Sequence, residues 1–175
     1  PNFGGVLKLT DKIRLKANYS ESYRAPSWIE LTSNKNLGSE EAKTYEVGLV
    51  YKKSLQNTFR INAYNTKIKG IITKIGADYK QESENKFLGA ELEYIYSPNS
   101  KAELTLSASY VDAKNGNGKR LPDVANKIAS TSFIYEFDSG ITTGSILKYL
   151  SSSSRTTADV RGDFDDSIVF NQTIS

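Results

Sequence analysis

Carboxylates are the first residues of this sequence that could carry chemistry, because a pair of them can act as acid and base. Glu46 lies in one segment in which apolar and polar residues alternate, and Glu91 and Glu93 lie in another such segment. Such pairs serve glycoside hydrolysis only where they flank a substrate. These three carboxylates would face water with no partner base, because the 175 residues contain no histidine and no cysteine. We therefore expect that the chain is not an enzyme.

Three aspartates form a second acidic group, at Asp163, Asp165 and Asp166. Calcium takes oxygen ligands, so a calcium site is one interpretation of this group. We favour the other, an exposed acidic loop. Haem and zinc commonly need imidazole, thiolate or thioether ligands, and the sequence has no histidine, cysteine or methionine. We expect no cofactor.

Aromatic and basic residues in the polar segments form a third group, which suits an anionic ligand. Its members are Trp28, Tyr79, Lys80, Lys119, Arg120 and Arg155. Any solvent-exposed rim would have a similar composition, so a surface without a ligand stays an alternative. A formal charge of +3 without a basic stripe between aromatics argues against nucleic acid as a partner.

The elements that must position these residues are strands, because apolar and polar residues alternate with a period of two. Ile13, Leu15, Ala17 and Tyr19, for example, alternate with Arg14, Lys16 and Asn18. The predicted strands after the first turn are 13–20, 43–53, 58–68, 88–96, 104–110, 127–137, 141–150 and 167–174. In the third of these the alternation changes phase at Tyr64, which predicts a β-bulge.

The connections between the predicted strands alternate in length. Short ones at 11–12, 54–57, 98–101 and 138–140 alternate with long ones at 24–42, 70–86, 112–126 and 151–165. Membrane barrels have short turns at the periplasmic rim and long loops at the outer rim. The rhythm predicts an all-β fold, part of an antiparallel transmembrane β-barrel. A mean hydropathy of −0.48 agrees, because only one face of each strand meets lipid.

The aromatic residues indicate two levels along the strands. Tyr51, Tyr94, Tyr96, Tyr135 and Phe137 lie near short turns, whereas Tyr19, Tyr45, Tyr110 and Tyr149 lie farther along their strands. This second set lies roughly 8 to 10 residues from the nearest short turn. At about 3.3 Å per residue and a tilt near 40°, that is about 20 to 25 Å of height, which matches one apolar band of a membrane. Ordinary strand residues of a soluble sandwich are the alternative.

Several stretches together resemble the barrel of TonB-dependent outer-membrane receptors. The resemblance is carried by Ser22-Tyr23-Arg24-Ala25-Pro26, by Thr44-Tyr45-Glu46-Val47-Gly48, and by Gly89-Ala90-Glu91-Leu92-Glu93. Stretches at 62–72, 108–113 and 121–127 add to it, and Glu40 stands in the loop between the first two stretches. The two prolines usual in that loop are absent. The resemblance covers nearly the whole chain.

The resemblance implies a receptor of the bacterial outer membrane that imports a scarce nutrient with TonB energy coupling. A ferric siderophore is the first expected ligand, cobalamin the second and haem the third. The implied partners are a plug domain, TonB, outer-membrane lipid and lipopolysaccharide. The family barrel has about 22 strands and this chain about nine, so we expect residues 1–175 to be a fragment without the plug and the flanking strands. A passive porin or a structural barrel is the alternative.

The resemblance also gives three residues a physical role. Pro26 has no backbone N–H and restricts Ala25, so strand pairing should end there. Arg24 would then sit at the rim, either contacting an anionic ligand or a lipid phosphate, or paired with a carboxylate such as Glu46; we favour the ion pair. Gly89 should let plug side chains approach the barrel wall closely, or alternatively relieve the coiling of its strand.

Overall fold

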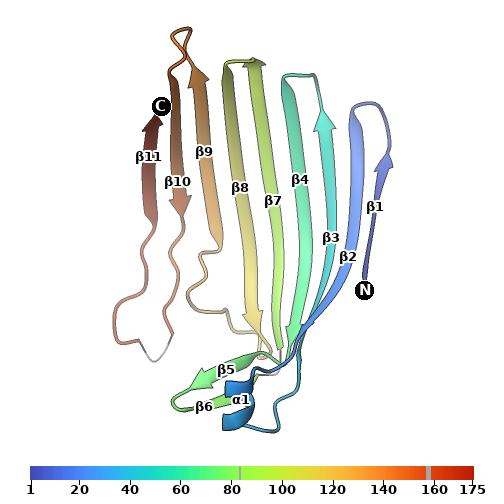
Figure 1. Cartoon of the computed structure of the whole chain (residues 1–175), viewed down its shortest axis with the longest axis vertical. Coiled ribbons are helices and arrows are strands. Elements are labelled where there is room, and N and C mark those ends of the chain that lie inside the picture. The colour runs from blue at the N-terminus through green and yellow to red at the C-terminus, as the bar shows by residue number, and fades with distance from the viewer. Residues whose placement is uncertain (83, 157–158) are drawn as a thin grey trace.

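The computed structural model describes residues 1–82, 84–156 and 159–175, and these residues form one large antiparallel sheet (Figure 1). Within these ranges the sheet has nine strands in the order β1-β2-β3-β4-β7-β8-β9-β10-β11. The strands are β1 (Asn2–Lys8), β2 (Ile13–Arg24), β3 (Glu40–Lys52), β4 (Asn57–Lys69), β7 (Glu84–Asn99), β8 (Ala102–Asn115), β9 (Lys127–Glu136), β10 (Thr142–Leu150) and β11 (Ser167–Ile174). The predicted all-β antiparallel fold is confirmed.

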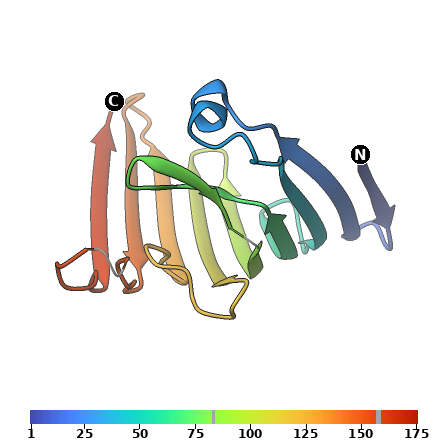
Figure 2. The same ribbon diagram turned by 90° about the horizontal axis from the view of Figure 1, so that it is seen from below.

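One end of the sheet carries the short turns and the other carries the long connections (Figure 1). Two of the long connections contain structure that we predicted as loop. The first holds helix α1 (Trp28–Ser33), and the second holds a hairpin of β5 (Ile72–Ile75) and β6 (Asp78–Gln81). Both lie beyond the ends of the strands (Figure 1). Seen along the strands, both lie toward the same face of the sheet (Figure 2). Among the described residues, no helix is both long and apolar enough to cross a membrane.

The strand alternation sorts side chains onto two faces. Leu88, Leu92 and Ile61 belong to the face that we call the apolar face, and all three are half exposed or more. The opposite, polar face carries hydrogen-bonded pairs such as Thr44 with Thr66, whose hydroxyl oxygens lie 2.9 Å apart. Among the described residues, only Leu37 and Ala113 are buried hydrophobics. Within the part of the chain that the structure describes, the sheet is thus a single layer without a second layer over its apolar side chains.

The predicted bulge at Tyr64 is wrong, because β4 pairs with β3 and with β7 in an unbroken register through this residue. Tyr64 projects from the polar face and lies directly opposite Gly89. A Cβ atom at Gly89 would lie 2.3 Å from the Tyr64 ring. The close approach expected at Gly89 therefore exists, but the approaching group is this tyrosine of the neighbouring strand.

Aromatic side chains form two groups on the apolar face. Near the short turns, the rings of Phe59 and Tyr94 stack with centroids 4.5 Å apart, and Tyr135 and Phe137 meet at 4.8 Å. Toward the long connections, Tyr19 and Tyr45 lie 4.8 Å apart on adjacent strands. The two predicted levels of aromatic residues are therefore present. They bracket a band of aliphatic side chains that includes Leu49, the residue opposite both Leu15 and Ile61.

The contact between Tyr64 and Gly89 leads to a stability prediction. The Gly89→Ala substitution in the full-length protein should lower the free energy of unfolding by about 1 to 3 kcal/mol, because the added methyl group must displace the ring. Gly144→Ala is the control, since a Cβ atom there meets nothing within 4 Å. Urea unfolding in lipid vesicles measures both. If Gly89→Ala costs as much in a Tyr64→Ala background, the ring contact is not the cause.

Candidate functional site at the long-loop end

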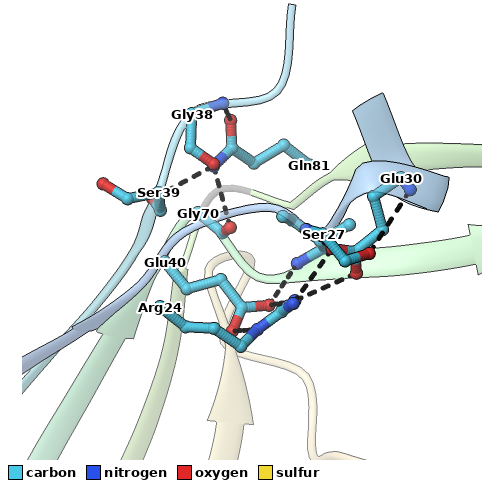
Figure 3. Close-up of polar contacts among 9 residues, drawn as sticks. Arg24, Ser27, Glu30, Gly38, Ser39, Glu40, Gly70 and Gln81 are labelled. Carbon is cyan, nitrogen blue, oxygen red and sulfur yellow. Dashed lines mark hydrogen bonds and ion pairs between the residues drawn. The ribbon is translucent and has the colours of Figure 1, made fainter. Parts of the chain in front are cut away.

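Arg24 joins three segments at the long-loop end of the sheet. Its Nε and Nη2 atoms donate to the two carboxylate oxygens of Glu40 at 2.7 and 2.8 Å. Nη1 donates to Glu30 at 3.0 Å (Figure 3). The Glu40 carboxylate also accepts the backbone N–H of Ile72 at 2.8 Å. One guanidinium therefore links the end of β2, helix α1 and the start of β3, and the hairpin is bound to the same carboxylate.

Local sequence explains the position of α1. β2 ends at Arg24, before Pro26, as we predicted. Ser27 then caps the helix, because its hydroxyl oxygen accepts the N–H of Glu30 and the Glu30 carboxylate accepts the N–H of Ser27 at 2.6 Å. This reciprocal pair is a capping box, which satisfies two backbone donors at the start of the helix. Glu30 is thus both cap and ion-pair partner.

Gln81 forms a second link between the two long connections. Its side-chain nitrogen lies within hydrogen-bond distance of the carbonyl oxygens of Gly38, Ser39 and Gly70, at 2.9 to 3.3 Å, and its side-chain oxygen accepts the N–H of Gly38 (Figure 3). Gly70 has a φ of 67°, which favours glycine. A single amide therefore holds the loop before β3 against the hairpin.

Glu46, the residue that we named as an ion-pair partner of Arg24, is not its partner. Glu40 lies directly across from Arg24 in the register of β2 and β3, whereas Glu46 lies across from Asn18 on the polar face. Six residues of strand separate the two glutamates, a distance of about 20 Å. The ion pair that we favoured for Arg24 is present, but with Glu40 and Glu30.

Three of the predicted ligand-binding residues belong to one assembly. Trp28 starts α1 and is 79% exposed, and Tyr79 and Lys80 lie on β6, the strand that α1 contacts. The side-chain amide of Asn34 donates to the carbonyl oxygen of Tyr79 at 3.1 Å. We name α1 together with β5 and β6 the mouth assembly. It presents an indole, a phenol and an ammonium group beyond the ends of the strands.

The other three predicted ligand-binding residues lie on the connections after β8 and β10. The backbone of Arg120 forms an isolated antiparallel β-bridge with Lys114. The carbonyl oxygen of Lys119 accepts the backbone N–H of Asn115 at 2.8 Å, which closes a turn. Arg155 is committed to its own loop: Nε donates to the carbonyl of Gly162 at 2.7 Å, and the guanidinium lies 3.6 Å from the centre of the Phe164 ring. The charge of Arg155 is therefore used within the loop.

Two aspartates of the acidic loop bind different partners. Asp163 accepts the N–H of Arg155, whereas Asp166 accepts the N–H of Ser152 and the hydroxyl of Tyr149. Across the described ranges, no group of three or more Asp, Glu, His or Cys side chains could hold a metal ion. The hydrogen bonds of Asp163 and Asp166 fit the exposed-loop interpretation.

The remaining motif residues have places on the strands. Tyr45 lies on the apolar face beside Tyr19, and Tyr23 is 80% exposed at the end of β2. Glu46 and Glu91 lie on the polar face, opposite Tyr64 and Asn62 respectively. Gly48 also faces Asn62, whose amide oxygen would lie 3.0 Å from an added Cβ atom. Glu93 follows Glu91 two residues on along the same face and forms an ion pair with Arg60.

Electrostatics supports the Arg24 network at ordinary pH. The Arg24 guanidinium and the N–H of Ser27 lower the pKa of Glu30 to about 2, and Arg24 also lowers the pKa of Glu40. Groups whose pKa is lowered on folding stabilise the structure above their ordinary pKa, here 4.5. That contribution is lost as the pH falls toward the lowered value.

These shifts lead to a pH prediction for the mouth assembly. A nitroxide on Lys35→Cys in the full-length protein should stay immobile from pH 7 to pH 5 and become mobile between about pH 4.5 and pH 2. Electron paramagnetic resonance measures the mobility. With Arg24→Gln added, the label should be mobile at every pH, whereas Arg60→Gln, which breaks the ion pair with Glu93 elsewhere, should change nothing. Mobility that begins at pH 6 would contradict the assignment.

Three comparisons place this geometry among known proteins. The family model for the β-barrel of TonB dependent receptor-like proteins matches residues 1–172. Comparison with curated protein sequences finds no match. Many solved structures are similar, and the chain covers less than a third of the length of those described next.

The ferric-catecholate import receptor Fiu of E. coli K12 has a TM-score of 0.75 at 15% identity over 99% of this chain and 28% of its own. The ferric yersiniabactin uptake receptor FyuA of Yersinia pestis has a TM-score of 0.77 at 14% identity, with coverages of 99% and 29%. A mutant of the ferric enterobactin receptor PfeA of Pseudomonas aeruginosa reaches 0.81 at 13%, with coverages of 98% and 31%. At these identities the likeness shows a shared fold. Because the family model matches residues 1–172, the chain belongs to the β-barrel family of TonB-dependent receptors.

Proposed function

We propose that this chain is a wall of an outer-membrane receptor that binds an anionic metal chelate, first of all a ferric siderophore, and imports it with TonB energy coupling. In this role the apolar face meets lipid, the polar face lines the barrel, and the long connections face outward. The short turns after β1, β3, β7 and β9 then lie at the periplasmic rim. A closed barrel of about 22 strands around a plug completes the proposal.

The observation that carries this proposal is the fixed mouth assembly. Free loops would lose conformational entropy on binding, and an anchored assembly loses less. Arg24 anchors α1 through its hydrogen bonds to Glu30, and Gln81 anchors the hairpin through its hydrogen bonds to the loop before β3. Exposed Trp28 and Lys80 then offer an aromatic surface and a positive charge, which suit an aromatic or carboxylate-rich chelate.

The chemistry of the side chains narrows the ligand class. The chain has no cysteine, histidine or methionine, so these 175 residues offer a transition metal no thiolate, imidazole or thioether ligand. Recognition by this wall would therefore act on the organic shell of a chelate, through stacking and charge. Ferric siderophores fit this description best. Cobalamin comes second, and haem third because no axial histidine is present.

Charge reversal tests the proposal. The full-length receptor with Lys80→Glu, Lys119→Glu and Arg120→Glu should bind an anionic ferric siderophore about tenfold more slowly at low salt, and the deficit should shrink as salt is raised. Stopped-flow fluorescence measures the association rate, and uptake of radioactive iron by iron-limited cells measures transport. The association rate and the iron uptake should both fall in the triple variant, and iron uptake should stop in cells without TonB.

Lys12→Glu, Lys52→Glu and Lys53→Glu provide the matched control, because the same change of charge is made at the short-turn end. This control should leave association unchanged. Arg155→Glu tests a different point. The Arg155 guanidinium contacts Gly162, Asp159 and Phe164, so we expect the substitution to disorder this loop and to change the association rate at low salt only slightly. Wild-type association by the triple variant at the mouth would remove these residues from the site.

A further inference from the structure

Two asparagine–glycine pairs follow each other where β8 ends, Asn115-Gly116 and Asn117-Gly118. In such a pair the backbone nitrogen of the glycine can attack the side-chain amide of the asparagine, because glycine has no side chain that hinders the approach. The same residue follows each asparagine, so the two should react alike in an unfolded chain. The folded chain treats them differently.

Asn115 is held in place by the fold. It is the last residue of β8 and pairs with Asn85 of β7. Its side-chain oxygen accepts the backbone N–H groups of Asn117 and Lys119 at 3.1 and 3.0 Å. The amide can turn toward the nitrogen of Gly116 only after these two hydrogen bonds break. Asn115 should therefore react slowly in the folded protein.

Asn117 lies in the turn that follows and is exposed. Within the described ranges, its hydrogen bond to Asn115 comes from the backbone and leaves its own side-chain amide without a partner. The N–H of Gly118 donates to the carbonyl oxygen of Asn115 at 2.9 Å, and an added Cβ atom at Gly118 would meet nothing within 4 Å. One backbone hydrogen bond of an exposed turn thus has to open before the attack, and such local openings cost little.

Two cations directly follow the second pair. Lys119 and Arg120 are both exposed. The attack passes through a negatively charged backbone nitrogen and a negatively charged oxygen, and neighbouring positive charges stabilise both. The basic residues of this connection therefore favour the reaction at Asn117.

From these contacts we propose that Asn117 is a site of spontaneous deamidation, with water as the co-reactant. The Gly118 nitrogen gives its proton to water and forms a bond to Cγ of Asn117. The bond from Cγ to the side-chain nitrogen then breaks, and the nitrogen leaves as ammonia. Water adds to the cyclic imide and opens it to aspartate or isoaspartate. Oxygen from water replaces the lost nitrogen, and no electron is gained or lost.

The reaction changes the charge of this connection. Residues 115–121 contain two cations and no anion, so a carboxylate at position 117 leaves a single net positive charge. Charge-changing modifications act on binding through the same electrostatics as side chains. An anionic ligand would be attracted less strongly by the modified protein. This consequence rests on the proposed function, whereas the deamidation itself does not.

Peptide mapping by mass spectrometry tests the site in the full-length protein, aged in mildly alkaline buffer either folded in lipid vesicles or unfolded in urea. Cleavage after Lys114 and Lys119 gives one peptide with both asparagines, and its fragment ions separate them. The unfolded protein should deamidate at both positions at similar rates. The folded protein should react at Asn117 at least about tenfold faster than at Asn115, because two hydrogen bonds hold the Asn115 amide.

Equal rates at the two positions in the folded protein overturn the proposal. So does a folded protein in which neither asparagine reacts while the unfolded protein reacts at both.

Fixed variants test the consequence for binding. Compared with freshly purified wild type, Asn117→Asp should bind an anionic ferric siderophore about twofold more slowly at low salt, and Asn117→Gln, which keeps an amide, should not differ. Deamidation at Asn117 together with wild-type association of Asn117→Asp would support the modification site and count against the proposed function alone.

Discussion

Hydrocarbon offers no hydrogen bonds to a backbone, so a chain that crosses it must pair its own N–H and C=O groups. An antiparallel sheet does this between neighbouring strands, and the alternation of side chains then assigns one face to each environment. In this chain the register keeps that assignment through β4 and β7, including Tyr64 and Gly89. The pairing register is therefore the constraint on which the rest of the structure depends. It sets the aromatic levels and the polar face together.

The same register determines what happens where the strands end. It brings Arg24 opposite Glu40, and the guanidinium then reaches Glu30 on the helix that follows Pro26. Charge-assisted, two-point contacts of this kind are among the stronger hydrogen bonds in proteins. The paired ends of β2 and β3 thus hold parts of two long connections in place through Arg24 and Glu40. Loops organised in this way can present side chains in fixed positions while remaining accessible to a ligand.

The strands could be predicted from the sequence because a period of two needs only neighbouring residues, and the end of β2 because Pro26 acts locally. The partner of Arg24 could not, because choosing Glu40 over Glu46 requires the register between two strands. Tyr64 suggested a bulge because the sequence does not indicate that a glycine faces it. The capping box could have been found in the sequence, since Ser27 and Glu30 lie three positions apart, but we predicted this segment as loop. The role of Gln81 could not be found in this way, because its partner Gly38 is 43 residues away.

We propose that one face of these strands meets lipid while the other lines the barrel. A cysteine scan of residues 104 to 110 on β8 tests it directly, because this chain contains no cysteine. Each position carries a nitroxide in the full-length protein in lipid vesicles, and its relaxation by oxygen and by a water-soluble nickel chelate is measured. We expect high oxygen accessibility at 104, 106, 108 and 110 and low oxygen accessibility at 105, 107 and 109. Uniform accessibility, or alternation in the opposite phase, would contradict it.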